Sequence, residues 1–205
     1  MKLSLKRLIF SNWKLASIQC HSVSFQNFLK KNKAMQLLVL AILIVGVVAA
    51  NAFTVSQIKY QNEALEHHNT LRAAHCSAPL QLDNNLNTIA QNYADYLAAR
   101  NIFQHSNNGY GENLYMTSSS APIRSLSGTG ATQAWYDEID YYNFNSPGFS
   151  SSTGHFTQVV WKTSTKLGVG IAFSLDGRRA YVVANYDPPG NYMGQFAQQV
   201  GRSGC

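Results

Sequence analysis

Four side chains in the second half of the sequence are of types that could bind a ligand together: His105, Glu112, Glu138 and His155. Each has an aromatic residue or a glycine close by, and none lies in a run of charges. Imidazole nitrogens suit zinc or copper, and nearby carboxylates can orient the rings or hold metal-bound water. The intervals between the four match no short ligand motif. The residues alone therefore leave two readings open, a metal site or a water-filled polar cleft.

Separate elements must carry these side chains toward one another. Apolar periodicity predicts a helix over Ser56 to His75 and a second helix that begins at an Asp83 N-cap. His105 follows the second helix, and Glu112 lies in "GENLYMT", which is typical of a short strand. The site would then join a loop and a strand.

The other two side chains are predicted to lie on helices. Glu138 lies in "ATQAWYDEIDYY" and His155 in the first turn of a short helix from Gly154 to Trp161. The runs "LGVGIAFSL" and "RAYVVANY" flank Asp176-Gly177, a strong hairpin signal. This order predicts an α+β fold, with helices on both faces of a small, mainly antiparallel sheet.

Four ordered segments, "HNTLR", "GENLY", "GHFTQVVWKTS" and "VVANYDPPGN", resemble the signatures of the CAP superfamily (cysteine-rich secretory proteins, antigen 5 and pathogenesis-related proteins). The resemblance covers residues 60 to 195. It implies an α-β-α sandwich with an open cleft lined by His105, Glu112, Glu138 and His155. It also implies that His105 and His155 can bind a divalent metal, usually zinc. Because such ligands must be neutral, we expect metal affinity to fall as the pH drops through about 6.5.

The cysteine pattern departs from that of many secreted relatives. Where they have a cysteine in the last signature and another before Gly-Glu-Asn, this chain has Ala184 and Tyr110. The sequence thus resembles the cysteine-poor Golgi-associated plant pathogenesis-related type. Past residue 52 only Cys76 and Cys205 occur, so they could form one bridge within a chain, or Cys205 could link two chains.

The resemblance also implies a lipid ligand, because some relatives bind sterols or fatty acids. The loop "IDYYNFNSPGF" corresponds to the region implicated in sterol capture. Four of its rings could form an apolar lid: Tyr141, Tyr142, Phe144 and Phe149. The alternative is that these rings pack on their own domain.

Two other motif residues are expected to be structural. His68 and Arg72 lie one helical turn apart and are predicted to bond to buried backbone rather than to a ligand.

Catalysis is not expected. Ser118 could join His105 as a nucleophile in a hydrolase, but it lies in a serine run without a defined base or oxyanion donors. We therefore expect a protein that binds rather than catalyses. The alternative is an extracellular defence or protein-interaction factor without a ligand.

The positive charge of the chain belongs to its leader. Seven basic residues and no acidic one precede residue 53, whereas nine basic residues face ten acidic ones after it. The basic surface of a nucleic-acid-binding protein is therefore not expected. The apolar run from Leu37 to Ala50 is short for a membrane span.

The leader predicts export. Residues 35–52 read as a signal peptide cleaved before Phe53, with an uncleaved membrane anchor as the alternative. Residues 1–34 have no clear role, and a single extracellular domain is predicted over 53–205.

Overall fold

The computed structural model describes residues 33, 36–40 and 53–204. The chain divides into two compact units, Met1–Phe53 and Thr54–Cys205. Residues 33 and 36–40 of the first unit are helical, and the predicted cleavage site lies outside the described residues, as does Cys205. No described helix has the length and apolar character of a membrane span.

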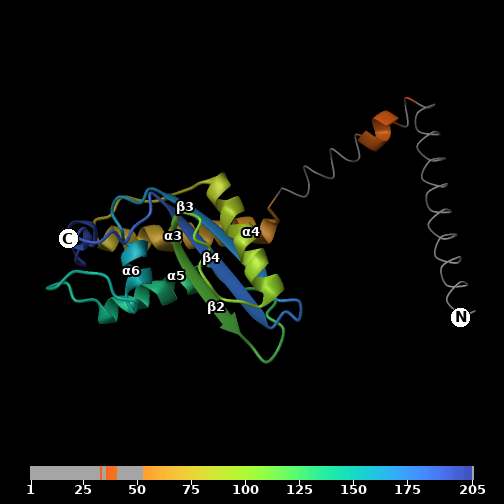
Figure 1. Cartoon of the computed structure of the whole chain (residues 1–205). Coiled ribbons are helices and arrows are strands. Elements are labelled where there is room, and N and C mark those ends of the chain that lie inside the picture. The colour runs from red at the N-terminus through yellow and green to blue at the C-terminus, as the bar shows by residue number, and fades with distance from the viewer. Residues whose placement is uncertain (1–32, 34–35, 41–52, 205) are drawn as a thin grey trace, which may run out of the picture. The chain divides into compact units, whose positions relative to one another are not determined.

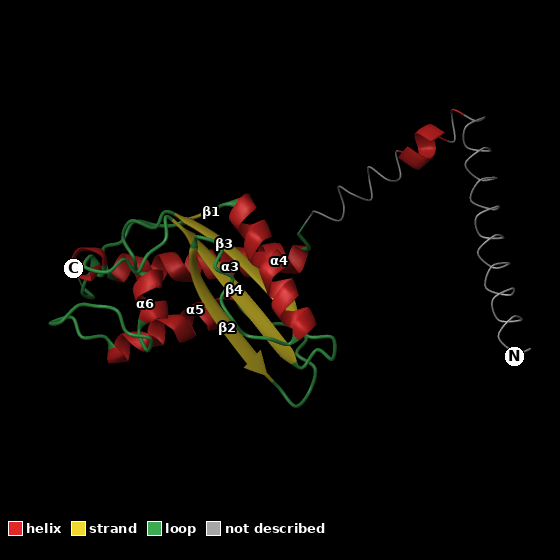
Figure 2. Cartoon of the chain, in the orientation of Figure 1, coloured by secondary structure: helices red, strands yellow, loops and turns green. Residues whose placement is uncertain are grey.

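The second unit is a four-stranded mixed sheet with helices on both faces (Figure 1), which confirms the predicted α+β class. The sheet order is β1-β3-β4-β2, with β1 parallel to β3 and the other pairs antiparallel (Figure 2). The elements, in chain order, are α3 (Val55–Ala74), β1 (Gln81–Leu82), α4 (Asn84–Arg100), β2 (Gly111–Ser118), α5 (Gly128–Tyr136), the 3-10 helix η1 (Asp137–Tyr141), α6 (Gly154–Val159), β3 (Lys166–Phe173), β4 (Arg179–Asp187) and α7 (Phe196–Gln199).

Two of these elements, β1 and α7, were not predicted from the sequence. Both are too short to show an apolar period, since β1 has two residues and α7 has four. The N-cap of α4 is confirmed, because the Asp83 carboxylate accepts the backbone N–H groups of Asn85 and Leu86.

The sheet separates two apolar cores. One core lies between α4 and the sheet, and the larger one lies between the sheet and the layer formed by α3, α5 and α6. The helix α4 approaches β3 closely because Gly168 and Gly170 have no side chain: a Cβ at either position would meet the α4 backbone at Leu86 or Ala90.

The outer edge of β3 is completed by side-chain amides. Past its short pairing with β1, β3 has no strand partner on this side. Asn87 accepts the N–H of Val169, Gln91 bonds to both the N–H and the C=O of Ile171, and Gln61 donates to the C=O of Val169, at distances of 2.8 to 3.1 Å. These amides imitate a neighbouring strand and cover an edge that would otherwise be open.

A buried guanidinium joins α3 to the segment that follows α6. Arg72 is inaccessible to solvent and donates to four backbone carbonyls, those of Ala78, Val159, Trp161 and Ser164, at 2.8 to 2.9 Å. Burial lowers the pKa of Arg72 to about 10, so the group stays charged at neutral pH. The carbonyls at the end of α6 are thus satisfied by a side chain of α3.

One turn earlier, His68 connects α3 to the sheet. Its Nδ1 donates to the Ala64 carbonyl (2.7 Å), so its Nε2 accepts from the Tyr186 hydroxyl (2.8 Å). Burial lowers the pKa of His68 to about 4, and the nearby Arg72 charge lowers it further, against the opposing effect of the Ala64 carbonyl. His68 is therefore a neutral, structural residue.

We predict that Arg72→Met lowers the free energy of unfolding by about 3–5 kcal/mol, because it leaves several buried carbonyls without a donor. Arg178→Met, at an exposed hairpin position, is the control and should change stability by less than about 0.5 kcal/mol. Urea unfolding of both variants measures the difference. Equal effects would show that the Arg72 bonds are not needed for stability.

We also predict an acid-dependent loss of stability from His68. The unfolded chain binds a proton at this ring near pH 6.5, whereas the folded protein does so only near pH 4. The stabilisation is therefore present above pH 6.5 and is lost as the pH falls through that window, by on the order of 3 kcal/mol. Urea unfolding from pH 7.5 to 4 should show this slope, and His68→Gln should flatten it. An unchanged slope in His68→Gln would contradict the assignment.

Candidate functional site

His105 and Glu112 form the first pair of the site. The His105 ring lies in the loop after α4, and its Nδ1 donates to Glu112 Oε1 at 2.7 Å. The Glu112 carboxylate, at the start of β2, also accepts the backbone N–H of Ser106 (2.9 Å) and the Ser106 hydroxyl. The ring is 58% exposed, whereas the carboxylate is 6% exposed. A buried carboxylate therefore fixes the orientation of an accessible imidazole.

His155 and Glu138 repeat this arrangement. His155 Nδ1 donates to Glu138 Oε1 at 2.6 Å, and the backbone N–H groups of His155 and Phe156 donate to Glu138 Oε2. The carboxylate comes from η1 and satisfies the first N–H groups of α6, which has no side-chain cap of its own. The ring is 32% exposed and packs along Trp135.

Both imidazoles therefore present the same atom for binding. A carboxylate only accepts when ionised, so Nδ1 of each ring carries the hydrogen and Nε2 carries the lone pair. Among the described residues, Nε2 of His105 and Nε2 of His155 have no hydrogen-bond partner. A metal-binding histidine in proteins commonly has this arrangement, with the second ring nitrogen held by a carboxylate.

Asn113 connects the two pairs. It follows Glu112 in β2, and its amide donates to the backbone carbonyl of His155 (3.1 Å) and to the Tyr186 hydroxyl (3.2 Å). The same hydroxyl donates to His68, so one buried network joins α3, β2, α6 and β4. The two histidines are therefore held by neighbouring residues at the start of one strand.

The carboxylates hold the rings but do not converge as direct ligands. Within the described part of the chain, no three His, Cys, Asp or Glu side chains gather into a metal-binding group. A cation here would have imidazole nitrogens and water as its ligands.

The hollow beside His105 contains only one member of the predicted tetrad. It has a volume of about 590 Å³ and is lined by α4 and the 104–108 loop, whereas Glu112, Glu138 and His155 do not line it. The four side chains are thus observed as two dyads joined through β2, and the open cleft around them stays a prediction from the resemblance.

The aromatic loop between Glu138 and His155 divides into two groups. Tyr142 is buried in the larger core and Phe144 is partly buried against it, and both rings contact Phe156. Tyr141 and Phe149 are exposed, at 75% and 54%. The interpretation in which the rings pack on their own domain therefore holds for the first two, and the second two are the ones that are mostly exposed to a ligand.

Ser118 does not lie within hydrogen-bonding distance of His105 in the same chain. It is the last residue of β2, whereas Glu112, the partner of His105, is the second. Six residues of strand separate the two by about 20 Å. The serine that does meet this glutamate is Ser106.

Sequence reasoning missed the three residues that support the dyads: Ser106, Asn113 and Tyr186. Their partners are distant in sequence, apart from the short span from Ser106 to Glu112. The sequence did indicate that Tyr186 needs a partner. It follows an apolar run and is therefore expected to be buried, and a buried tyrosine hydroxyl usually makes a hydrogen bond.

Cys76 is disulfide-bonded. Gly204 donates its backbone N–H to the Ala74 carbonyl (3.0 Å), which brings the end of the described chain beside the loop after α3. The predicted bridge from Cys76 to Cys205 and the alternative link between two chains both involve Cys205, which lies outside the described residues.

Comparisons with known proteins agree with this architecture. The model of the "Cysteine-rich secretory protein family", CAP, matches residues 65–186. The chain is 43% identical over 148 residues to Golgi-associated plant pathogenesis-related protein 1 of Homo sapiens, covering 69% of this chain and 92% of that one. It is 38% identical over 142 residues to Secreted protein RBT4 of Candida albicans, covering 68% of this chain and 38% of that protein. The crystal structure of NaASP2 with Zn²⁺ superposes with a TM-score of 0.55 at 26% identity, covering 72% of this chain and 86% of that one.

Proposed function

Because the chain belongs to the CAP family, we propose that it is an exported binding protein whose two histidine–glutamate dyads hold a divalent cation, zinc. The observation that carries this proposal is the pairing of both Nδ1 atoms with carboxylates, which leaves both Nε2 lone pairs unpartnered among the described residues. Imidazole nitrogen suits zinc, and outer carboxylates raise its basicity as a ligand. The relative solved with Zn²⁺ supports the choice of metal.

The residues present fit a weakly held, accessible ion rather than a structural one. A structural zinc site has four protein ligands, whereas the described residues offer two here, His105 and His155. Water would complete the coordination, since both rings are accessible to solvent. Bound zinc would supply a Lewis acid, and this chain's part is to present two oriented imidazoles.

Binding, rather than catalysis, is the activity that we propose. A hydrolase that uses Ser118 would need this hydroxyl at His105, and the length of β2 separates them. A defence or protein-interaction role without a ligand remains the alternative. Export is supported by the leader and by a relative whose name describes a secreted protein.

A second proposal, lipid binding at the aromatic loop, is supported by Tyr141 and Phe149. Exposed aromatic rings lose unfavourable contact with water when an apolar ligand covers them, by about 25 cal/mol per Å². A sterol or a fatty acid offers such a surface.

Zinc titration of the purified chain tests the first proposal. We expect one zinc per chain and at least tenfold weaker binding in the His105→Ala/His155→Ala double variant, measured by calorimetry at neutral pH. Glu138→Gln should weaken binding by about 10–100-fold, because it removes the negative charge and one of the two acceptor oxygens that hold His155. His67→Ala, which alters a histidine bonded to Gln133 outside the site, is the control. Undiminished binding in the double variant would exclude this site.

Saturable binding of labelled cholesterol tests the second proposal. Tyr141→Ala and Phe149→Ala should weaken it, while thermal stability stays close to that of the parent because both rings are exposed. Phe144→Ala should instead lower stability by about 1–3 kcal/mol, since this partly buried ring packs against the core. Sterol binding that does not saturate, or that is unaffected by the two loop variants, would refute this lipid site.

A further inference from the structure

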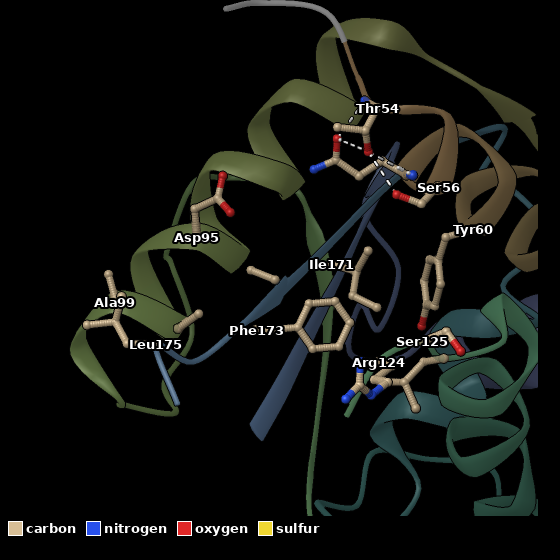
Figure 3. A pocket seen from close by; sticks show the side chains of 14 residues that line it. Thr54, Ser56, Tyr60, Asp95, Ala99, Arg124, Ser125, Ile171, Phe173 and Leu175 are labelled. Carbon is tan, nitrogen blue, oxygen red and sulfur yellow. Dashed lines mark hydrogen bonds between the residues drawn. The ribbon is translucent and has the colours of Figure 1, made fainter. Parts of the chain in front are cut away.

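A second pocket lies farther along the sheet than the dyads, since five residues of β4, about 17 Å, separate the partner of Glu112 from the partner of Phe173. It has a volume of about 470 Å³, within the usual range for ligand sites. The start of α3, the end of α4, the 124–126 loop and the end of β3 line it. In Figure 3 the Phe173 ring lies in the middle, with Tyr60 and Arg124 on one side and Asp95 and Ala99 on the other.

The pocket lies where the amide-covered edge of β3 comes to its end. Asn87 and Gln91, four residues apart on α4, bond to Val169 and Ile171, two residues apart on β3. The spacings agree, because four helical residues rise about 6 Å and two strand residues about 6.6 Å. The next pair in this series would be Asp95 and Phe173.

That third pair is not formed. The Asp95 carboxylate accepts from the Gln91 side chain instead (3.1 Å). Phe173 continues the alternation of β3, so its N–H and C=O face the same outer edge as those of Val169 and Ile171. Neither group has a partner among the described residues. The pocket therefore presents the unpaired N–H and C=O of one strand-edge residue, Phe173.

Two further donors face this space without partners in the described structure. The Tyr60 side chain is largely buried, but its hydroxyl makes no hydrogen bond with a described residue, and Figure 3 shows it directed toward Ser125. Burial raises the pKa of Tyr60 well above its ordinary value, so the hydroxyl stays a donor. The Arg124 guanidinium, on the same side, has neither an ion pair nor a hydrogen bond with any described residue. A hydroxyl donor that opens into the pocket and a nearby cation together suit a carboxylate.

The floor of the pocket is apolar. Phe173 is partly exposed and Leu175 fully exposed, and Ile171, Ala98 and Leu126 complete the lining. An apolar side chain fits this floor. The unpaired N–H and C=O of Phe173 can bond to the backbone of a peptide, and a lipid has no such groups.

We propose that this pocket binds the C-terminal end of an extended peptide. The peptide backbone pairs with Phe173, its last side chain covers the apolar floor, and its carboxylate accepts from Tyr60 and Arg124. This is addition of a strand to a sheet edge, with the side-chain amides of α4 and α3 continuing the edge. The site is separate from the dyads and does not depend on zinc.

The probe is a mixture of acetylated tetrapeptides of varied sequence with an apolar last residue and a free carboxylate. It is added at millimolar concentration to the purified chain labelled with ¹⁵N. We expect hydrogen exchange of the Phe173 amide to slow at least about tenfold. The same mixture with N-methylated backbones should give no protection, and the mixture with C-terminal amides should bind about tenfold more weakly.

Variants identify the groups that hold the carboxylate. Arg124→Gln and Tyr60→Phe should each weaken binding of the free-acid mixture by about tenfold and leave binding of the amide mixture unchanged. Lys59→Gln, an exposed change on the first turns of α3, should leave both unchanged. Lack of Phe173 protection, or binding that is insensitive to Arg124→Gln, overturns the proposal. Dodecanoate that binds here when the peptides do not would also overturn it, in favour of a lipid.

Discussion

The hydrogen bonding of a single buried cation, Arg72, holds the domain together. A guanidinium removed from water must satisfy its donors internally, and here four backbone carbonyls do so in place of a carboxylate. Because Val159 and Trp161 lie at the end of α6, the bonds hold this short helix against α3. Six residues of helix would have little stability alone. The position of His155, at the other end of α6, thus depends on a side chain more than eighty residues earlier.

A second buried network of hydrogen bonds connects the four sequence segments that carry the family resemblance. His68, Asn113, His155 and Tyr186 each belong to one of them, and hydrogen bonds join all four residues. Tyr186 is central, since its hydroxyl donates to His68 and accepts from Asn113. Burying a polar group without a partner costs about 1–3 kcal/mol, so the loss of one member leaves its neighbours unsatisfied. The same bonds that stabilise the core therefore position the dyads.

The two proposed sites use different properties of the fold. At the dyads, carboxylates with several donors each hold an imidazole in one orientation, which favours a ligand that seeks a lone pair. At the end of β3, the backbone N–H and C=O of Phe173 have no hydrogen-bond partner in the described part of the chain, because the covering amides stop at Gln91. Glu112 of the first dyad and Phe173 of the peptide pocket pair with β4 at positions several residues apart. Each can therefore be disabled without loss of the other.

The sequence alone determined the fold class, most elements and the four site residues, because these depend on local periodicity, turn chemistry and the segments that carry the resemblance. It did not determine which glutamate holds which histidine, nor which loop rings are exposed: Phe144 packs in the core while Phe149 does not. Only the tertiary structure decided these points, along with the unpaired edge at Phe173. Such features arise from contacts between residues far apart in the chain, and the buried partner of a polar group leaves no periodic trace in the sequence.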